Sequence, residues 1–172
     1  MTTTTLPEYW LRGSVEGIPL LLQPVAHALL QAREEIHTLM GDFDDAYLWV
    51  KPAGKASVGF HLQHLTGVLD RLFTYARGAT LSLEQLQYLK SEGVSVETSA
   101  SVLVERFNQQ VERSLEQLKA TNPESLLDFR GVGRQQLPST VQGLLFHAAE
   151  HTMRHLGQLL MTAAVVGHLT DK

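Results

Sequence analysis

The sequence predicts an all-α protein, a four-helix bundle with long crossover connections and a short extra helix between the second and third long helices. Four long stretches place apolar residues three and four positions apart, which is typical of helices with one buried face. No stretch of any length alternates apolar and polar residues as a strand does. Connections of roughly fifteen residues are long enough to cross the bundle. With 172 residues, we expect one domain over residues 1–172.

The first long helix is expected after a loose N-terminal lead-in. Residues 1–12 are rich in Thr and contain Pro7, whereas helical spacing of apolar side chains begins after Ser14. Pro24 either kinks this helix or moves its start later, because proline lacks the backbone N–H. Gly41, followed by Asp42, ends it. Its apolar positions are Leu20, Leu21, Leu22, Val25, Ala26, Leu29, Leu30, Ile36, Leu39 and Met40.

A second long helix and a short one follow the connection at residues 43–56. Ser57 is a plausible N-cap of the second helix, which ends near Gly78. Ser82 similarly caps a short helix that ends before Gly93. The second helix has its apolar positions at Val58, Phe60, Leu65, Val68, Leu69, Leu72, Phe73 and Ala76.

The third long helix is expected over residues 95–119, stopped by the Asn122–Pro123 pair. Its apolar stripe is Val102, Leu103, Phe107, Val111, Leu115 and Leu118. Residues 126–138 form either a short hairpin or an irregular loop.

The last long helix starts at a hydroxyl cap, Ser139 or Thr140, and is expected to reach about Val166 and stop at Gly167. Val141, Leu144, Leu145, Ala148, Met153 and Leu159 support it.

Composition excludes several classes of function. Lys and Arg total 14 against 18 Asp and Glu, a net charge of −4, which argues against nucleic acid as a partner. There are 0 Cys residues, which rules out disulfides, Cys-ligated zinc and a Cys nucleophile. The polar N-terminus does not resemble a secretory signal, and no run reaches the about 20 apolar residues of a membrane span. We therefore expect a soluble, cytoplasmic protein with no membrane partner.

Five of the 8 histidines lie in two short windows, and these are the candidate metal ligands. His147, His151 and His155 are spaced by four in the last helix, and His61 and His64 lie in the second. His147 and His155 are separated by about 12 Å along a helix at about 1.5 Å per residue, too far to share one ion. The pair is therefore His147 and His151 or His151 and His155, with His61 or His64 as the third ligand.

Three neutral imidazoles suit Zn, Ni, Cu or Fe better than Mg or Ca, which prefer oxygen ligands. Three protein ligands also leave positions open for water or substrate, as in catalytic sites. A bound metal would hold an external thiol as thiolate or lower the pKa of water. Glu150 points about 100° away from His151 around the helix, and no buried carboxylate base is evident. The alternative is that these histidines are hydrogen-bonded residues of the core.

Three segments resemble the DinB/YfiT-like family of metalloenzymes. Ser57–Leu72 is similar to the family's second helix, and Leu81–Lys90 is similar to its short helix. Glu150–Gln158 is similar to the last helix, with two histidines four apart followed by Gly-Gln. The similarity extends from about Ser14 to Val166. It implies a four-helix bundle with a crossed-over connection and a DinB-like domain.

The resemblance also implies a divalent metal bound by His64, His151 and His155, with His61 and His147 as core or rim residues. Zn or Ni is expected, with Fe or Mn as alternatives. The implied function is a metal-dependent transferase of a low-molecular-weight thiol, or a hydrolase, acting on a small-molecule substrate as a homodimer. The alternative is a non-catalytic metal-binding or structural stress-response bundle. Leu156 stands where relatives often carry Arg, which weakens the case for an anionic cosubstrate at that position.

Overall fold

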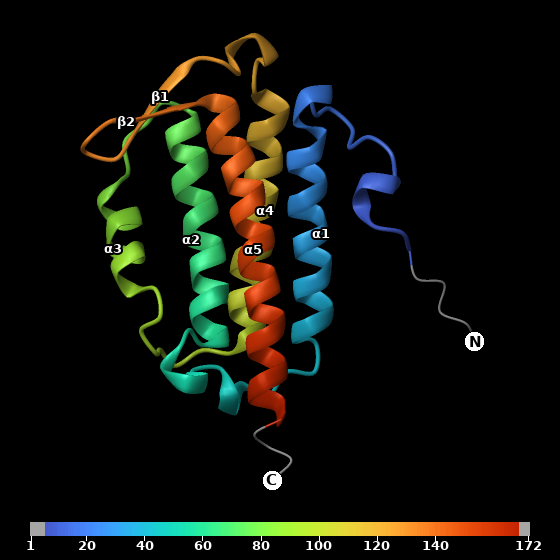
Figure 1. Cartoon of the computed structure of the whole chain (residues 1–172), viewed down its shortest axis with the longest axis vertical. Coiled ribbons are helices and arrows are strands. Elements are labelled where there is room, and N and C mark those ends of the chain that lie inside the picture. The colour runs from blue at the N-terminus through green and yellow to red at the C-terminus, as the bar shows by residue number, and fades with distance from the viewer. Residues whose placement is uncertain (1–5, 169–172) are drawn as a thin grey trace.

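The computed structural model describes residues 6–168 as a bundle of four long helices with a short helix along one side (Figure 1). The long helices are α1 (Gln23–Met40), α2 (Val58–Ala76), α4 (Ala100–Ala120) and α5 (Val141–His168), and the short one is α3 (Leu83–Ser91). This confirms the predicted all-α bundle and its extra helix.

The helices are connected with a crossover. α2 packs against both α4 and α5, and α1 packs against the same two helices, so that α1 and α2 lie diagonally opposite (Figure 1). α1 and α5 run in one direction, and α2 and α4 run in the other. The chain therefore returns along the bundle between α2 and α4, and α3 lies in that return segment beside α2.

The core lies between the four long helices, and each contributes large apolar side chains to it. Leu29 of α1, Leu69 of α2, Phe107 of α4 and Leu145 of α5 are at most 1% exposed. Burying one such side chain contributes about 1.5–3 kcal/mol to folding. The hydrophobic faces of α2 and α5 thus hold their backbones side by side, which is the packing that any site between them requires.

Side-chain caps fix the starts of the helices. Ser57 accepts a hydrogen bond of 3.1 Å from the Phe60 amide at the start of α2. Ser82 and Gln85 form a reciprocal capping box at the start of α3. At α5, the Thr140 hydroxyl accepts from the Gly143 amide at 3.0 Å, so Thr140 is the cap.

The structure decides between the two alternatives for the start of α1, and two other helix ends differ from the sequence prediction. Pro24 lies in the first turn of α1 after a 3-10 turn at Leu20–Leu22, so it moves the start of the helix later and does not kink it. α4 begins at Ala100, five residues after the predicted start at Ser95, because Ser99 caps it by accepting from the Val102 amide at 3.3 Å. α5 does not stop at Gly167 but continues to His168.

The N-terminal lead-in was expected to be loose, but its second half lies against α1. Tyr9–Leu11 form a 3-10 turn, and the Tyr9 amide donates to Gln31 at 2.9 Å. Arg12 pairs with Glu34 at 2.7 Å. The expectation is therefore wrong for residues 9–12, while residues 1–5 of the lead-in lie outside the described part of the chain.

The segment between α4 and α5 is a hairpin. β1 (Phe129–Val132) pairs antiparallel with β2 (Leu137–Thr140), with Val132 opposite Leu137. Short 3-10 turns occupy Asp45–Tyr47, Pro52–Gly54 and Pro123–Ser125. Within residues 6–168, no helix combines the length and the apolar character that crossing a membrane would require.

Candidate metal centre

The packing of α2 against α5 brings the two histidine windows together. His64 of α2 and His151 and His155 of α5 each offer a ligand atom, and these three atoms all lie within 4.8 Å of one another. The ring of His155 is 4.4 Å from the ring of His64 and 4.6 Å from that of His151, between centroids. The structure therefore groups the three residues that the sequence resemblance implied as ligands.

The nitrogen atoms have a spacing that suits one small metal ion. The Nε2 atoms of His64 and His151 are 3.0 Å apart. Two ligands of a tetrahedral ion with metal–nitrogen bonds of about 2.0–2.1 Å would lie about 3.3 Å apart. In addition, Nδ1 of His151 is buried and has no hydrogen-bond partner within residues 6–168. Within those residues, the hydrogen bond that orients this ring is therefore the one at Nε2.

The surroundings of His151 and His155 keep both imidazoles uncharged. Burial, followed by the nearby His64, lowers the pKa of His151 to about 4. Burial, His64 and His151 lower the pKa of His155 to about 3. Both rings are consequently neutral at pH 7, and a neutral imidazole is the form that binds metals.

His61 lies beside the three histidines and contacts one of them. Its side chain is buried, and its Nδ1 is 3.2 Å from Nδ1 of His155. Burial, and then the neighbouring His64, lowers its pKa to about 4. Since its Nδ1 faces Nδ1 of His155, His61 is placed to orient that ring.

A carboxylate missed by the sequence prediction completes the surroundings of the site. Glu92, at the end of α3, has a side chain only 5% exposed and places Oε2 2.6 Å from Nδ1 of His64. Its Oε1 lies 2.5 Å from Arg71 of α2. The sequence revealed no buried carboxylate base, and Glu92 is a buried carboxylate beside the histidines that is already paired with Arg71 and His64.

His147 and Glu150 lie at the rim of the site. The His147 side chain is 49% exposed and its Nδ1 is 3.3 Å from Glu150, which also pairs with Arg154. The Arg154 contact lowers the pKa of Glu150, so this carboxylate is a weak base. His147, Glu150 and His151 also lie close enough to form a second candidate group, which is more exposed.

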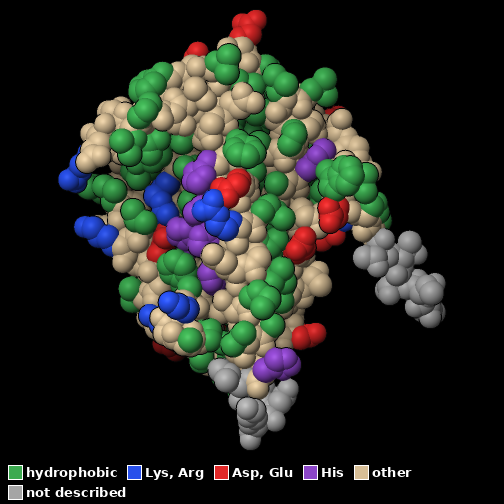
Figure 2. All heavy atoms as spheres, in the orientation of Figure 1, with side chains coloured by type: hydrophobic (Ala, Val, Ile, Leu, Met, Phe, Trp, Pro, Cys, Tyr) green, Lys and Arg blue, Asp and Glu red, His purple; other side chains and the backbone are tan. Residues whose placement is uncertain are grey.

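A cavity of about 580 Å³ lies beside His61. His61 lines it, together with Lys55, Arg154, Gly157, Gln158 and Met161. Figure 2 shows histidine side chains gathered near the middle of this face, with basic side chains beside them. Because His61 contacts His155, a molecule in this cavity would lie next to the metal site.

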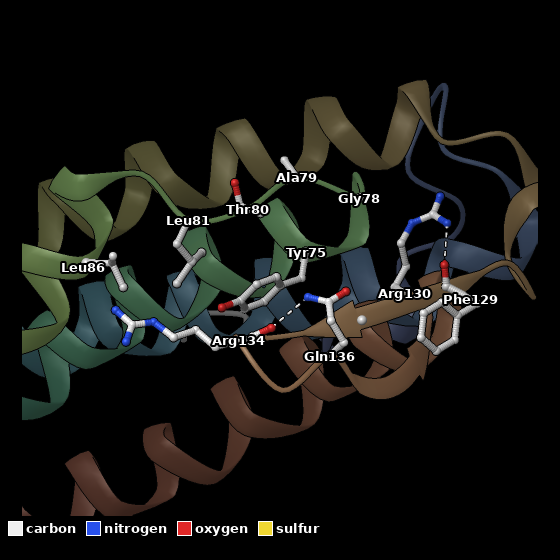
Figure 3. A pocket seen from close by; sticks show the side chains of 12 residues that line it. Tyr75, Gly78, Ala79, Thr80, Leu81, Leu86, Phe129, Arg130, Arg134 and Gln136 are labelled. Carbon is white, nitrogen blue, oxygen red and sulfur yellow. Dashed lines mark hydrogen bonds between the residues drawn. The ribbon is translucent and has the colours of Figure 1, made fainter.

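A second cavity, of about 520 Å³, is lined by the hairpin and the turn after α2, where Gly78 closes the helix. Tyr75 projects into it, and the Arg134 side chain extends along it towards Leu86 (Figure 3). Its lining residues include no histidine. Of these two cavities, the first is the one that adjoins the histidines, through His61.

The comparison with protein families matches the family described as the DinB superfamily to residues 28–159. That range includes α2, α3 and α4 completely and the four histidines of the site. No curated protein sequence matches the chain.

Proposed function

The chain belongs to the DinB superfamily, and we propose that it is a metal-dependent enzyme that transfers a low-molecular-weight thiol to an electrophilic small molecule. In this proposal His64, His151 and His155 bind one divalent ion, with Zn or Ni favoured. The observation that carries the proposal is the convergence of three ligand atoms within 4.8 Å, two of them 3.0 Å apart.

The donor set supports a transition metal of this kind. Imidazole nitrogens suit Zn, Ni, Cu and Fe, whereas Mg and Ca take oxygen ligands. The low pKa values of His151 and His155 mean that few protons compete with the ion at pH 7. Three protein ligands leave coordination positions for a substrate atom.

A bound divalent ion would supply Lewis acidity, which stabilises a thiolate or hydroxide at neutral pH. The chain itself contains 0 Cys, so a thiol must come from a cosubstrate. The cavity of about 580 Å³ beside His61 has the size of a small-molecule pocket. Lys55 and Met161 on its wall offer one charged and one apolar contact for orienting that molecule.

Thiol transfer is favoured over hydrolysis by the state of the nearby carboxylates. Hydrolysis benefits from a general base close to the attacking water. Glu92 is bound by Arg71 and His64, and Glu150 is bound by Arg154. Both carboxylates are thus engaged in ion pairs. A thiol is a much stronger acid than water, so it can lose its proton to solvent without a nearby base.

The proposal is tested by assaying thiol conjugation with protein loaded with Zn or Ni, using glutathione and 1-chloro-2,4-dinitrobenzene as the probe pair. We expect turnover that a chelator abolishes and that His151→Ala lacks. His37→Ala is the control, because His37 lies exposed on α1.

Ester hydrolysis is measured in the same preparations with 4-nitrophenyl acetate. Metal-dependent hydrolysis without thiol conjugation would contradict the proposed thiol transfer and identify the protein as a hydrolase. Metal binding with neither activity across further thiols and electrophiles would favour the non-catalytic metal-binding bundle.

A further inference from the structure

Glu92 shares its two carboxylate oxygens between a cation and a candidate metal ligand. Its Oε1 accepts from Arg71 at 2.5 Å, and its Oε2 lies 2.6 Å from Nδ1 of His64. Side-chain exposure is 5% for Glu92, 10% for Arg71 and 17% for His64. These three side chains therefore form a largely buried chain of charge-assisted hydrogen bonds, which are shorter and stronger than neutral ones.

The contact defines which nitrogen of His64 carries the proton. A carboxylate is an acceptor only, so Nδ1 must be the donor. Nε2 of the neutral ring then holds a lone pair, and this is the atom that faces His151 at 3.0 Å. We propose that Glu92 is a positioning residue of the metal site, which fixes the tautomer and the rotation of His64 so that Nε2 binds the ion. The inference rests on the proposed three-histidine site.

One face of α2 accommodates the Glu92 carboxylate. His64, Gly67 and Arg71 are spaced by three and four residues, so they lie on one face of the helix. A Cβ at Gly67 would lie 2.6 Å from Nη1 of Arg71 and would also collide with Glu92. Glycine is thus required for the Arg71–Glu92 pair to fit against the helix.

The end of α3 is attached to α2 by further hydrogen bonds on either side of Glu92. The Tyr88 hydroxyl donates to the Gln63 carbonyl at 3.1 Å, and the Gly93 amide donates to the Gln63 side chain at 2.7 Å. The Phe60 ring stacks on the His64 ring, with the ring centroids 5.3 Å apart and an angle of 10° between the ring planes. The carboxylate and the ring are therefore held in one arrangement before any ion binds.

The charge of Glu92 matters as well as its position. Three neutral imidazoles bring no negative charge to a divalent ion, and Glu92 supplies one through His64. Carboxylates that hydrogen-bond to a metal-binding histidine raise its basicity, and removing them weakens metal binding about 10–100-fold. Without metal, Arg71 balances the same charge, so the buried carboxylate is paired in both states.

The test compares Glu92→Gln with Glu84→Gln, the same substitution at an exposed residue of α3. Zinc affinity is measured by competition with a chelating dye, and the fold is monitored by circular dichroism. We expect Glu92→Gln to bind zinc about 10–100-fold more weakly and Glu84→Gln to match the wild type. Equal affinity in Glu92→Gln and the wild type would overturn the proposal.

A second measurement on metal-free protein separates orientation of His64 from simple attachment of α3. Imidazole ¹⁵N NMR at about pH 8, above the free histidine pKa of about 6.5, reports the tautomer of His64. We expect His64 to adopt the Nδ1–H form in the wild type. Glu92→Leu, which removes the carboxylate, and Gly67→Ala, which displaces the Arg71–Glu92 pair, should both lose this preference. The Nε2–H form in the wild type would contradict the assigned role.

The two measurements also distinguish the inference from the proposed function. If the wild-type protein bound no zinc, the metal site itself would be overturned. The tautomer of His64 would still decide whether Glu92 orients the ring.

Discussion

The Nε2 atoms of His64 and His151 face each other at 3.0 Å across the interface of α2 and α5. In the metal-free protein one of these nitrogens must donate a proton to the other. Because Glu92 accepts a hydrogen bond from Nδ1–H of His64, Nε2 of His64 is the acceptor and Nε2 of His151 is the donor. Metal binding would replace this single hydrogen bond by bonds from both nitrogens, so the site is close to its metal-bound geometry in advance.

Metal should stabilise the folded protein. An ion that binds only the native state adds about 2.7 kcal/mol to the free energy of unfolding at 100 times its Kd. We expect the urea midpoint of the wild type to rise with added zinc, whereas that of His151→Ala should not. His147→Ala, at the exposed rim, should respond like the wild type. An equal response in His151→Ala would place the ion elsewhere.

The metal-free protein should lose stability as the pH falls below the pKa of unfolded histidine, even before the buried histidines of the folded protein become protonated. The pKa values of His61 and His151 are about 4 and that of His155 about 3, against about 6.5 in the unfolded chain. Between these values the unfolded state binds more protons, so stability is full above about pH 6.5 and falls as the pH drops towards 4.

Urea unfolding at pH 7.5 and at about pH 5 measures this loss. Replacing His61 by Leu should reduce the difference between the two pH values, because one lowered pKa is removed. The exposed His37→Ala variant should leave it unchanged. A wild-type stability that is flat across this range would contradict the low pKa values.

Two glycine substitutions should change stability in opposite directions. A Cβ at Gly59 would lie 2.5 Å from the Trp49 ring, so Gly59→Ala should cost about 1–3 kcal/mol. No atom lies within 4 Å of a Cβ at Gly157, and Ala there should stabilise α5 by about 0.5–1 kcal/mol. Urea unfolding followed by tryptophan fluorescence checks both. A neutral Gly59→Ala would mean that Trp49 repacks freely.

Filling the cavity beside His61 should block substrate and spare the metal. Gly157 lines this cavity and has open space around it. We expect Gly157→Phe to lower kcat/KM for thiol conjugation at least tenfold, or about 1.4 kcal/mol, with zinc content unchanged. Gly157→Ala, which adds one methyl group, should keep its activity. Undiminished activity in Gly157→Phe would show that substrate enters by another route.

The sequence predicts the helices and the proximity of two candidate ligands well, because both depend on local spacing. The interval of four places His151 and His155 one turn apart, and hydroxyl residues cap α2 and α3 as expected. Each step of four residues also turns about 40° around the axis. For this reason His147, eight residues before His155, has rotated out to the rim.

Other features depend on how distant elements pack, so spacing alone does not reveal them. Glu92 looks like an ordinary polar residue at the end of a short helix, and only the docking of α3 on α2 buries it beside His64. The spacing of His64, Gly67 and Arg71 was the available signal, but its meaning depends on the partner helix. The start of α4 was also misjudged, since Ser95 and Ser99 are both plausible caps.

Metal stoichiometry together with absorption spectroscopy at the metal edge tests the central claim most directly. The account predicts one ion per chain, with nitrogen neighbours at about 2.0–2.1 Å that include three imidazoles. His64→Ala, His151→Ala and His155→Ala should each lose the ion, and His37→Ala should keep it. Full metal content in any of the three variants, or a shell of oxygen neighbours without imidazole, would contradict the three-histidine site.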